Sequence, residues 1–196
     1  MSSVLGRLIG IGIVISCIAG CAVPATVAAP VADVKAVREA DTLERVRRLG
    51  HDGDWLVIRG YHATDDFVSV VTNTPWSHAA VLDVEKDEVI EAEGQGIHTT
   101  SLPAFIAKAH RLLLVRPDWS TETSARAALI KARALVGNRY DFLGLVALNV
   151  PDRYYCSELA VAVYRSHIPA GEPIPRPVTP AQLHHWGKIL YDSGNP

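Results

Sequence analysis

The chain has 196 residues, of which 48% are hydrophobic and 20% are charged. This length and composition fit one globular domain with a substantial core. The formal net charge is -2, and the chain contains no basic run, internal repeat or low-complexity tract. A repeat architecture is therefore excluded, and nothing in the charge suggests a nucleic-acid partner.

The N-terminal segment has the layout of a secretory signal. One positive side chain, Arg7, precedes the almost wholly apolar stretch from Leu8 to Ile18. This stretch is too short for a helix that spans a membrane. Cleavage near Ala25 or Ala29 would release an ordinary secreted protein.

The residues that follow the apolar stretch favour a different cleavage point. Ile18-Ala19-Gly20-Cys21 resembles the bacterial lipoprotein signal, in which cleavage leaves a lipid-bearing cysteine as the first mature residue. We therefore predict a signal peptide over 1–20, lipidation of Cys21, a tether over 21–32 and a folded domain over 33–196. Several acyl chains would hold this protein to a membrane of the bacterial cell envelope, facing the periplasm or the exterior.

The first half of the domain is predicted to contain a helix, a strand, a second helix and a β-hairpin. Apolar periodicity and turn residues place these elements at Val34 to Leu49, Trp55 to Arg59, Ala63 to Val71, Trp76 to Val84 and Glu88 to Ala92.

The rest of the domain is predicted to contain further strands first and then mostly helices. A strand over Ile97 to Thr100, a capped helix over Ser101 to Ile106 and a strand over Arg111 to Val115 precede an amphipathic helix over Ser120 to Leu135. A last helix is expected to start near Pro180, because proline is common at the first helical position. The order of elements indicates an α+β fold with an antiparallel sheet.

The predicted hairpin carries a histidine and an acidic residue. His78 lies near the start of its first strand and Glu91 lies in the second, thirteen residues later around a short turn. Residues on paired antiparallel strands can approach one another in this arrangement. Glu93 points to the same face as Glu91, because side chains alternate along a strand.

A cysteine lies at or near the start of another predicted helix. Pro151-Asp152 forms a turn before Cys156, and Leu159 and Val163 follow at helical spacing. Unpaired N–H groups at a helix N-terminus favour a thiolate, and they can also receive the oxyanion of a carbonyl under attack. An inert, buried cysteine is the alternative.

Cysteine counting strengthens the case for a functional thiol. Of the three cysteines, Cys17 lies in the signal and Cys21 would carry lipid, so Cys156 would be the free thiol of the mature chain. Catalysis by cysteine requires a nearby imidazole to carry the proton and a third polar group to orient that imidazole. Cys156, His78 and Glu91 supply these three residue types.

Five short motifs, in this order, resemble the YiiX/YaeF-like branch of the permuted papain-like hydrolases of the NlpC superfamily. The motifs are Gly53-Asp54-Trp55-Leu56-Val57, Trp76-Ser77-His78, Val89-Ile90-Glu91-Ala92-Glu93-Gly94, Gly137-Asn138-Arg139-Tyr140-Asp141-Phe142 and Tyr155-Cys156-Ser157-Glu158-Leu159. The resemblance implies a circularly permuted papain-like fold in which the histidine precedes the nucleophilic cysteine. It also implies Cys156 as nucleophile, His78 as base and Glu91 as third polar residue, with Glu93 as a rival for that last role.

The resemblance implies a cysteine hydrolase that cleaves an amide bond, with cell-wall peptide or a related amide as the expected substrate and no cofactor or metal. An acyltransferase or lipid esterase would use the same three residues. A binding lipoprotein of the cell envelope without catalytic activity is a further alternative. The eight histidines show no spacing typical of a metal site.

Overall fold

A computed structural model describes residues 28, 30–61, 74–144 and 150–194. Within these residues the strands form one six-stranded antiparallel sheet, in the order β4-β3-β2-β1-β5-β6. The strands are β1 (Trp55–Gly60), β2 (His78–Asp83), β3 (Glu88–Glu93), β4 (Gly96–Ser101), β5 (Ala109–Pro117) and β6 (Gly187–Asp192).

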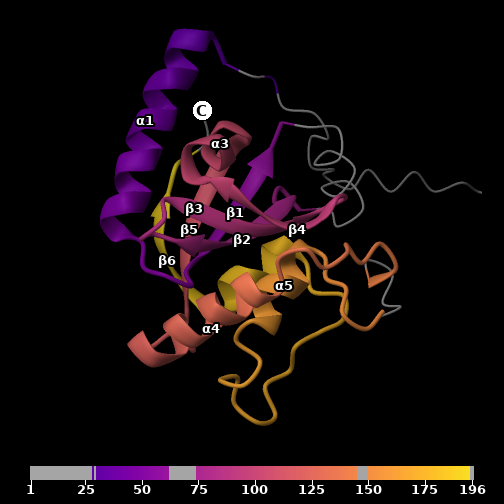
Figure 1. Ribbon diagram of the computed structural model, residues 1–196. Coiled ribbons are helices and arrows are strands. Elements are labelled where there is room, and N and C mark those ends of the chain that lie inside the picture. Colours follow the sequence, from indigo (N-terminus) through magenta and orange to yellow (C-terminus); the bar gives the residue numbers. More distant parts are fainter. Residues whose placement is uncertain (1–27, 29, 62–73, 145–149, 195–196) are drawn as a thin grey trace, which may run out of the picture.

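Helices cover both faces of this sheet (Figure 1). On one face lie α1 (Ala32–Leu49) and the short α3 (Leu102–Ala107). On the other face lie α4 (Glu122–Ala134), α5 (Cys156–Ala162) and the 3-10 helix η2 (Pro180–Trp186). None of the helices in the described part of the chain is long and apolar enough to cross a membrane.

The core has two layers because the interior strands are buried on both faces. The layer under α4 and α5 includes Trp55, Val57, Val81, Ile90, Leu159 and Tyr164. The layer under α1 and α3 includes Val46, Leu56, Ile58, Leu82, Phe105 and Leu114. Alternate residues of β1 therefore enter opposite layers, as the two-residue period of a strand requires.

Local sequence signals explain where two of the helices begin. Ser101 caps α3 through its side chain, which accepts a hydrogen bond from the Ala104 N–H. Thr121 and Ser124 form a reciprocal capping box at the start of α4. Both segments were predicted to be helices.

A charged pair joins the start of β1 to β5. The buried Asp54 accepts two hydrogen bonds from Arg116, at 3.0 and 2.8 Å. Gly53 beside it has a φ of +81°, and a Cβ there would lie 2.5 Å from the Tyr164 hydroxyl oxygen. That hydroxyl donates a hydrogen bond to the Gly53 carbonyl, which ties the turn to the end of the α5 segment.

The predicted α+β fold with an antiparallel sheet is confirmed. The prediction for the C-terminal segment needs correction, because the expected helix at Pro180 is a 3-10 helix and a further strand, β6, follows it. β6 pairs with β5 at the sheet edge. The predicted helix over Ala63 to Val71, the signal peptide and Cys21 lie outside the described residues.

Candidate active site

Three elements bring the predicted site residues together. His78 is the first residue of β2, Glu91 lies inside β3, and Cys156 is the first residue of α5. The register of β2 and β3 places Ala80 opposite Glu91, so the glutamate lies two positions along the strand pair from His78. Helix α5 packs against both strands.

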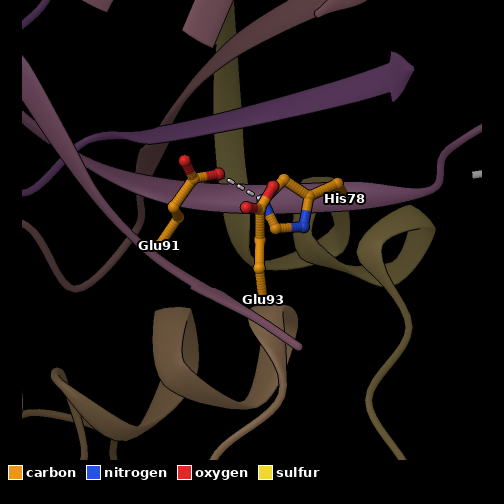
Figure 2. A group of neighbouring side chains, drawn as sticks. All are labelled: His78, Glu91 and Glu93. Atoms are coloured by element: carbon orange, nitrogen blue, oxygen red, sulfur yellow. Dashed lines mark hydrogen bonds and ion pairs between the residues drawn. The ribbon is translucent and has the colours of Figure 1, made fainter. Parts of the chain in front are cut away.

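The His78 imidazole contacts Glu91 directly. Its Nε2 lies 2.7 Å from Glu91 Oε2, whereas the nearest Glu93 oxygen lies 4.0 Å away (Figure 2). The Glu91 side chain is 0% exposed, and that of Glu93 is 31% exposed. Of the two acidic residues that the sequence left open, Glu91 is therefore the one that hydrogen-bonds the imidazole.

The imidazole also interacts with the thiol. Burial alone would lower the pKa of His78, but hydrogen bonds to Cys156 and Glu91 and the negative charge of both groups raise it to about 10. Nε2 is already bonded to Glu91, so the other ring nitrogen, Nδ1, is the one available to the sulfur. In Figure 2 this second nitrogen points away from both carboxylates. The arrangement therefore favours the protonated form of His78.

Two residues that sequence reasoning missed hold the Glu91 carboxylate. Its Oε1 accepts hydrogen bonds from the Thr100 hydroxyl and from Lys108 Nζ, the latter at 2.7 Å. Burial would raise the pKa of Glu91, but hydrogen bonds from His78, Lys108 and Thr100 and the His78 charge lower it to about 2. The carboxylate is therefore ionised and has a partner on each oxygen.

Lys108 joins the two acidic residues. Its ammonium lies 2.7 Å from Glu91 Oε1 and 2.8 Å from Glu93 Oε1. Lys108 follows α3 in the chain, far from the predicted motifs, so no sequence signal placed it here.

His98 also lies close to the site. It is on the edge strand β4, directly opposite Glu91 in the register. Its Nε2 lies 3.5 Å from Glu91 and 3.6 Å from Glu93. A prediction of which residues of β3 and β4 pair with one another would have placed His98 opposite Glu91.

The cysteine itself is buried, with 6% exposure, at the start of α5. Two hydrogen bonds fix the backbone around it. The Val178 N–H donates to the Tyr155 hydroxyl, and the Ser157 hydroxyl donates to the Val178 carbonyl, each at 2.8 Å. The predicted position of Cys156 at a helix start is therefore confirmed.

A buried aspartate shapes the segment before the cysteine. Asp141 is 0% exposed and accepts hydrogen bonds from the backbone N–H groups of Leu143, Gly144 and Val150, at 3.1, 2.9 and 3.1 Å. Burial and the negative charge of neighbouring groups raise the pKa of Tyr140, which precedes Asp141 in the chain.

Comparison with known proteins agrees with this arrangement. Residues 51–175 match the family of permuted papain-like amidase enzymes YaeF/YiiX, family C92. The chain belongs to this family. The match spans all three elements of the site and supports hydrolase or amidase activity in general.

The fold has a relative among solved structures. A crystal structure described as metalloprotein YiiX from Escherichia coli O157:H7 resembles the chain with a TM-score of 0.52 and 23% sequence identity. The similarity covers 61% of this chain and 67% of that one. The antiparallel sheet with helices on both faces is thus the permuted papain-like fold. No curated protein matches the chain.

Because that relative is described as a metalloprotein, a metal ion must be considered at this site. His78, Glu91 and Glu93 offer ligand atoms within 4.8 Å of one another. However, Nε2 of His78 is bonded to Glu91, and the Lys108 ammonium already bridges both carboxylates. A divalent cation would have to displace this ammonium, so the residues as arranged do not fit a metal ion.

Proposed function

We propose that the protein is a cysteine hydrolase that cleaves an amide bond through Cys156, His78 and Glu91. The observation that supports this proposal most strongly is the buried imidazole that hydrogen-bonds both a thiol and a carboxylate. A thiol nucleophile requires such a base, and the base requires such an orienting group. The family of amidases to which the chain belongs agrees with the reaction type.

In the proposed acylation step, the Cys156 thiolate attacks the carbonyl carbon of the amide and forms a carbon–sulfur bond. The backbone N–H of Cys156 donates to the oxyanion. As the tetrahedral intermediate collapses, the carbon–nitrogen bond breaks and the leaving amine takes the proton from His78 Nδ1. The products are a free amine, a thioester and a neutral imidazole.

In the deacylation step, the neutral His78 takes a proton from water, and the hydroxide oxygen attacks the thioester carbon. Collapse releases the carboxylic acid and restores the thiolate and the imidazolium. Throughout both steps Glu91 holds the Nε2 side of the ring, so that the Nδ1 side stays directed at the sulfur and the substrate.

The proposed substrate is a peptide amide of the cell wall. This proposal combines the amidase family with the predicted export of the chain, since a lipidated Cys21 would place the enzyme in the envelope. A test incubates the wild type and Cys156→Ser with isolated cell-wall peptides and measures new amino groups. Release by the wild type alone supports the substrate proposal, and no release from any peptide contradicts it.

The catalytic pair can be tested without knowledge of the substrate. We expect iodoacetamide to alkylate Cys156 rapidly at pH 6.5, because His78 stabilises the thiolate. In His78→Ala the rate at Cys156 should fall about a hundredfold, since pH 6.5 lies two units below the pKa of about 8.5 of an unperturbed thiol. Mass spectrometry of the peptide that contains Cys156 measures this rate.

A suitable control is His185→Ala, which removes an exposed histidine of η2. This variant should alkylate like the wild type. If the wild-type thiol reacts only near pH 9, or if His78→Ala reacts at the wild-type rate, the proposed mechanism is wrong.

We propose in addition that lipid on Cys21 anchors the protein to a membrane, as the lipoprotein-like signal predicts. Cys21→Ser should shift the protein from the membrane fraction to the supernatant after cell lysis and centrifugation. Cys17→Ser, within the signal itself, serves as the control and should leave the protein in the membrane fraction. Equal partitioning of Cys21→Ser and the wild type would contradict the anchor.

A further inference from the structure

A pocket of about 330 Å³ lies beside α5, outside the candidate active site. Glu158, Val161, Ala162 and Arg165 line it, and their spacing of three or four residues defines one face of the helical segment. Neither Cys156 nor the residues that contact His78 line this pocket. Its ligand would therefore not occupy the space between thiol and imidazole.

The walls of the pocket are built onto the helix that carries the cysteine. The segment Val150–Tyr155 lines it, as do Ile174–Arg176 and Val178. Val178 is fixed by the two hydrogen bonds to Tyr155 and Ser157 described above. Lys131 of α4 also lines the pocket. The pocket is thus part of the same rigid frame as α5.

Positive charge dominates the lining. Lys131, Arg153, Arg165 and Arg176 contribute four cationic groups, whereas Asp152 and Glu158 contribute two carboxylates. Within the described part of the chain, the guanidinium groups of Arg153, Arg165 and Arg176 form no hydrogen bond or ion pair. Burial and the charge of Arg165 lower the pKa of Lys131. The charges of Arg176 and Arg165 also act on the Glu158 carboxylate.

The same pocket contains a buried acceptor atom. The Glu158 carboxylate accepts a hydrogen bond from the Tyr155 backbone N–H. This interaction is usual for an acidic residue in the first turn of a helix. Its Oε2 is buried and has no hydrogen-bond partner among the described residues. A buried acceptor of this kind favours a ligand that supplies an N–H or O–H donor.

We propose that this pocket binds an anionic ligand that carries a carboxylate or phosphate group next to an N–H or O–H donor. The guanidinium groups bind the anion, because arginine matches the geometry of both carboxylates and phosphates. Glu158 Oε2 accepts a hydrogen bond from the N–H or O–H group of the ligand. This binding site is distinct from the proposed hydrolase site and adds a second ligand to the protein.

Calorimetric titration of the full-length protein tests the proposal with L-glutamate and with inorganic phosphate, and glutaramide serves as a neutral control. Glutamate binding assigns a carboxylate ligand, phosphate binding assigns a phosphate ligand, and either result supports the site. We expect Arg165→Gln and Arg176→Gln each to weaken the binding about tenfold or more, since each removes a charge-assisted hydrogen bond.

The matched control is Arg126→Gln, which removes a 75% exposed guanidinium of α4 that does not line the pocket. Its affinity should equal that of the wild type. The proposal is overturned if neither anion binds, if glutaramide binds equally well, or if Arg126→Gln weakens binding as much as the pocket variants.

The same titration separates this proposal from the proposed catalysis. Cys156→Ser should bind the anion with unchanged affinity, because the sulfur does not line the pocket. If Cys156 is unreactive but the anion binds, only the catalytic proposal fails. If Cys156 reacts as expected but no anion binds, only the binding proposal fails.

Discussion

At the scale of single residues, two neighbouring glutamates have different surroundings although they face the same way. Glu91 is fully buried and hydrogen-bonds His78, whereas Glu93 is partly exposed and bonds Lys108. Lys108 bridges the two carboxylates and offsets part of their negative charge. The imidazole therefore has one close acidic partner, and the second acidic residue completes the ion pair with the lysine.

This difference predicts unequal effects of two matched substitutions. Glu91→Gln should slow iodoacetamide alkylation of Cys156 at pH 6.5 about tenfold or more, because the imidazolium loses its close counter-charge. Glu93→Gln should change the rate less than about twofold, since its nearest oxygen lies 4.0 Å from the ring. A larger effect of Glu93→Gln than of Glu91→Gln would reverse the assignment of the third polar residue.

The buried carboxylate also predicts a pH dependence of stability. The pKa of Glu91 is about 2 in the folded chain and 4.5 as the ordinary value, so the folded state favours the ionised form. This contribution is fully present above pH 4.5 and is lost as the pH falls through about 2. It corresponds to about 3 kcal/mol of unfolding free energy at neutral pH.

Urea unfolding of the wild type and Glu91→Gln at pH 7, 4 and 3 measures this effect. The difference in unfolding free energy should be largest at pH 7 and should shrink toward pH 3. Glu85→Gln, in the exposed β2–β3 turn, serves as the control and should shift stability by less than about 0.5 kcal/mol at every pH. A Glu91→Gln difference that is constant with pH would contradict the low pKa.

Residue types and motif order were enough to predict Cys156, His78 and Glu91 as neighbours. They were not enough to choose between Glu91 and Glu93, because strand alternation places both on one face. The choice depends on distances across the hairpin and on burial. Lys108 was beyond prediction, since it reaches the site from the end of α3 by tertiary packing alone.

At the scale of elements, the approach to α5 is organised by one side chain. Asp141 accepts hydrogen bonds from three backbone N–H groups, those of Leu143, Gly144 and Val150, which precede the cysteine in the chain. Gly144 lies so close that a Cβ there would stand 2.7 Å from Asp141 Oδ2. The start of α5 therefore depends on hydrogen bonds formed well before it in the sequence.

Asp141→Ala is expected to reduce the unfolding free energy by about 2–4 kcal/mol, because buried N–H groups lose a charged acceptor. It should also slow alkylation of Cys156 at pH 6.5 in the folded protein. Urea unfolding and mass spectrometry measure the two effects. Asp118→Ala, at an exposed loop position, is the control, and an Asp141→Ala protein as stable as this control would contradict the role of Asp141.

Most helices and strands were predictable because capping residues and apolar periods mark them. The exception is β6, which the sequence did not reveal. Its residues Gly187–Asp192 are all partly or fully exposed and lack a clean alternation of buried and exposed positions. This strand forms through pairing with β5 at the sheet edge, and such tertiary pairing leaves only a weak pattern in the strand itself.

At the scale of the whole molecule, the α+β class followed from the order of elements, but the strand order did not. β1 lies between β2 and β5, and β6 adds to the far edge, so the sheet joins segments from both ends of the domain. Periodicity within a segment cannot show which strand becomes its neighbour. The family resemblance, not the local pattern, indicated the permuted topology.

The late position of β6 has a consequence for biosynthesis. Cys156 on α5 packs against the sheet that carries His78, and the last strand of that sheet, β6, follows Cys156 in the chain. A nascent or unfolded precursor carries the same thiol without the imidazole that activates it. The contact between the Cys156 thiol and the His78 imidazole therefore forms only after the domain has been synthesised and folded.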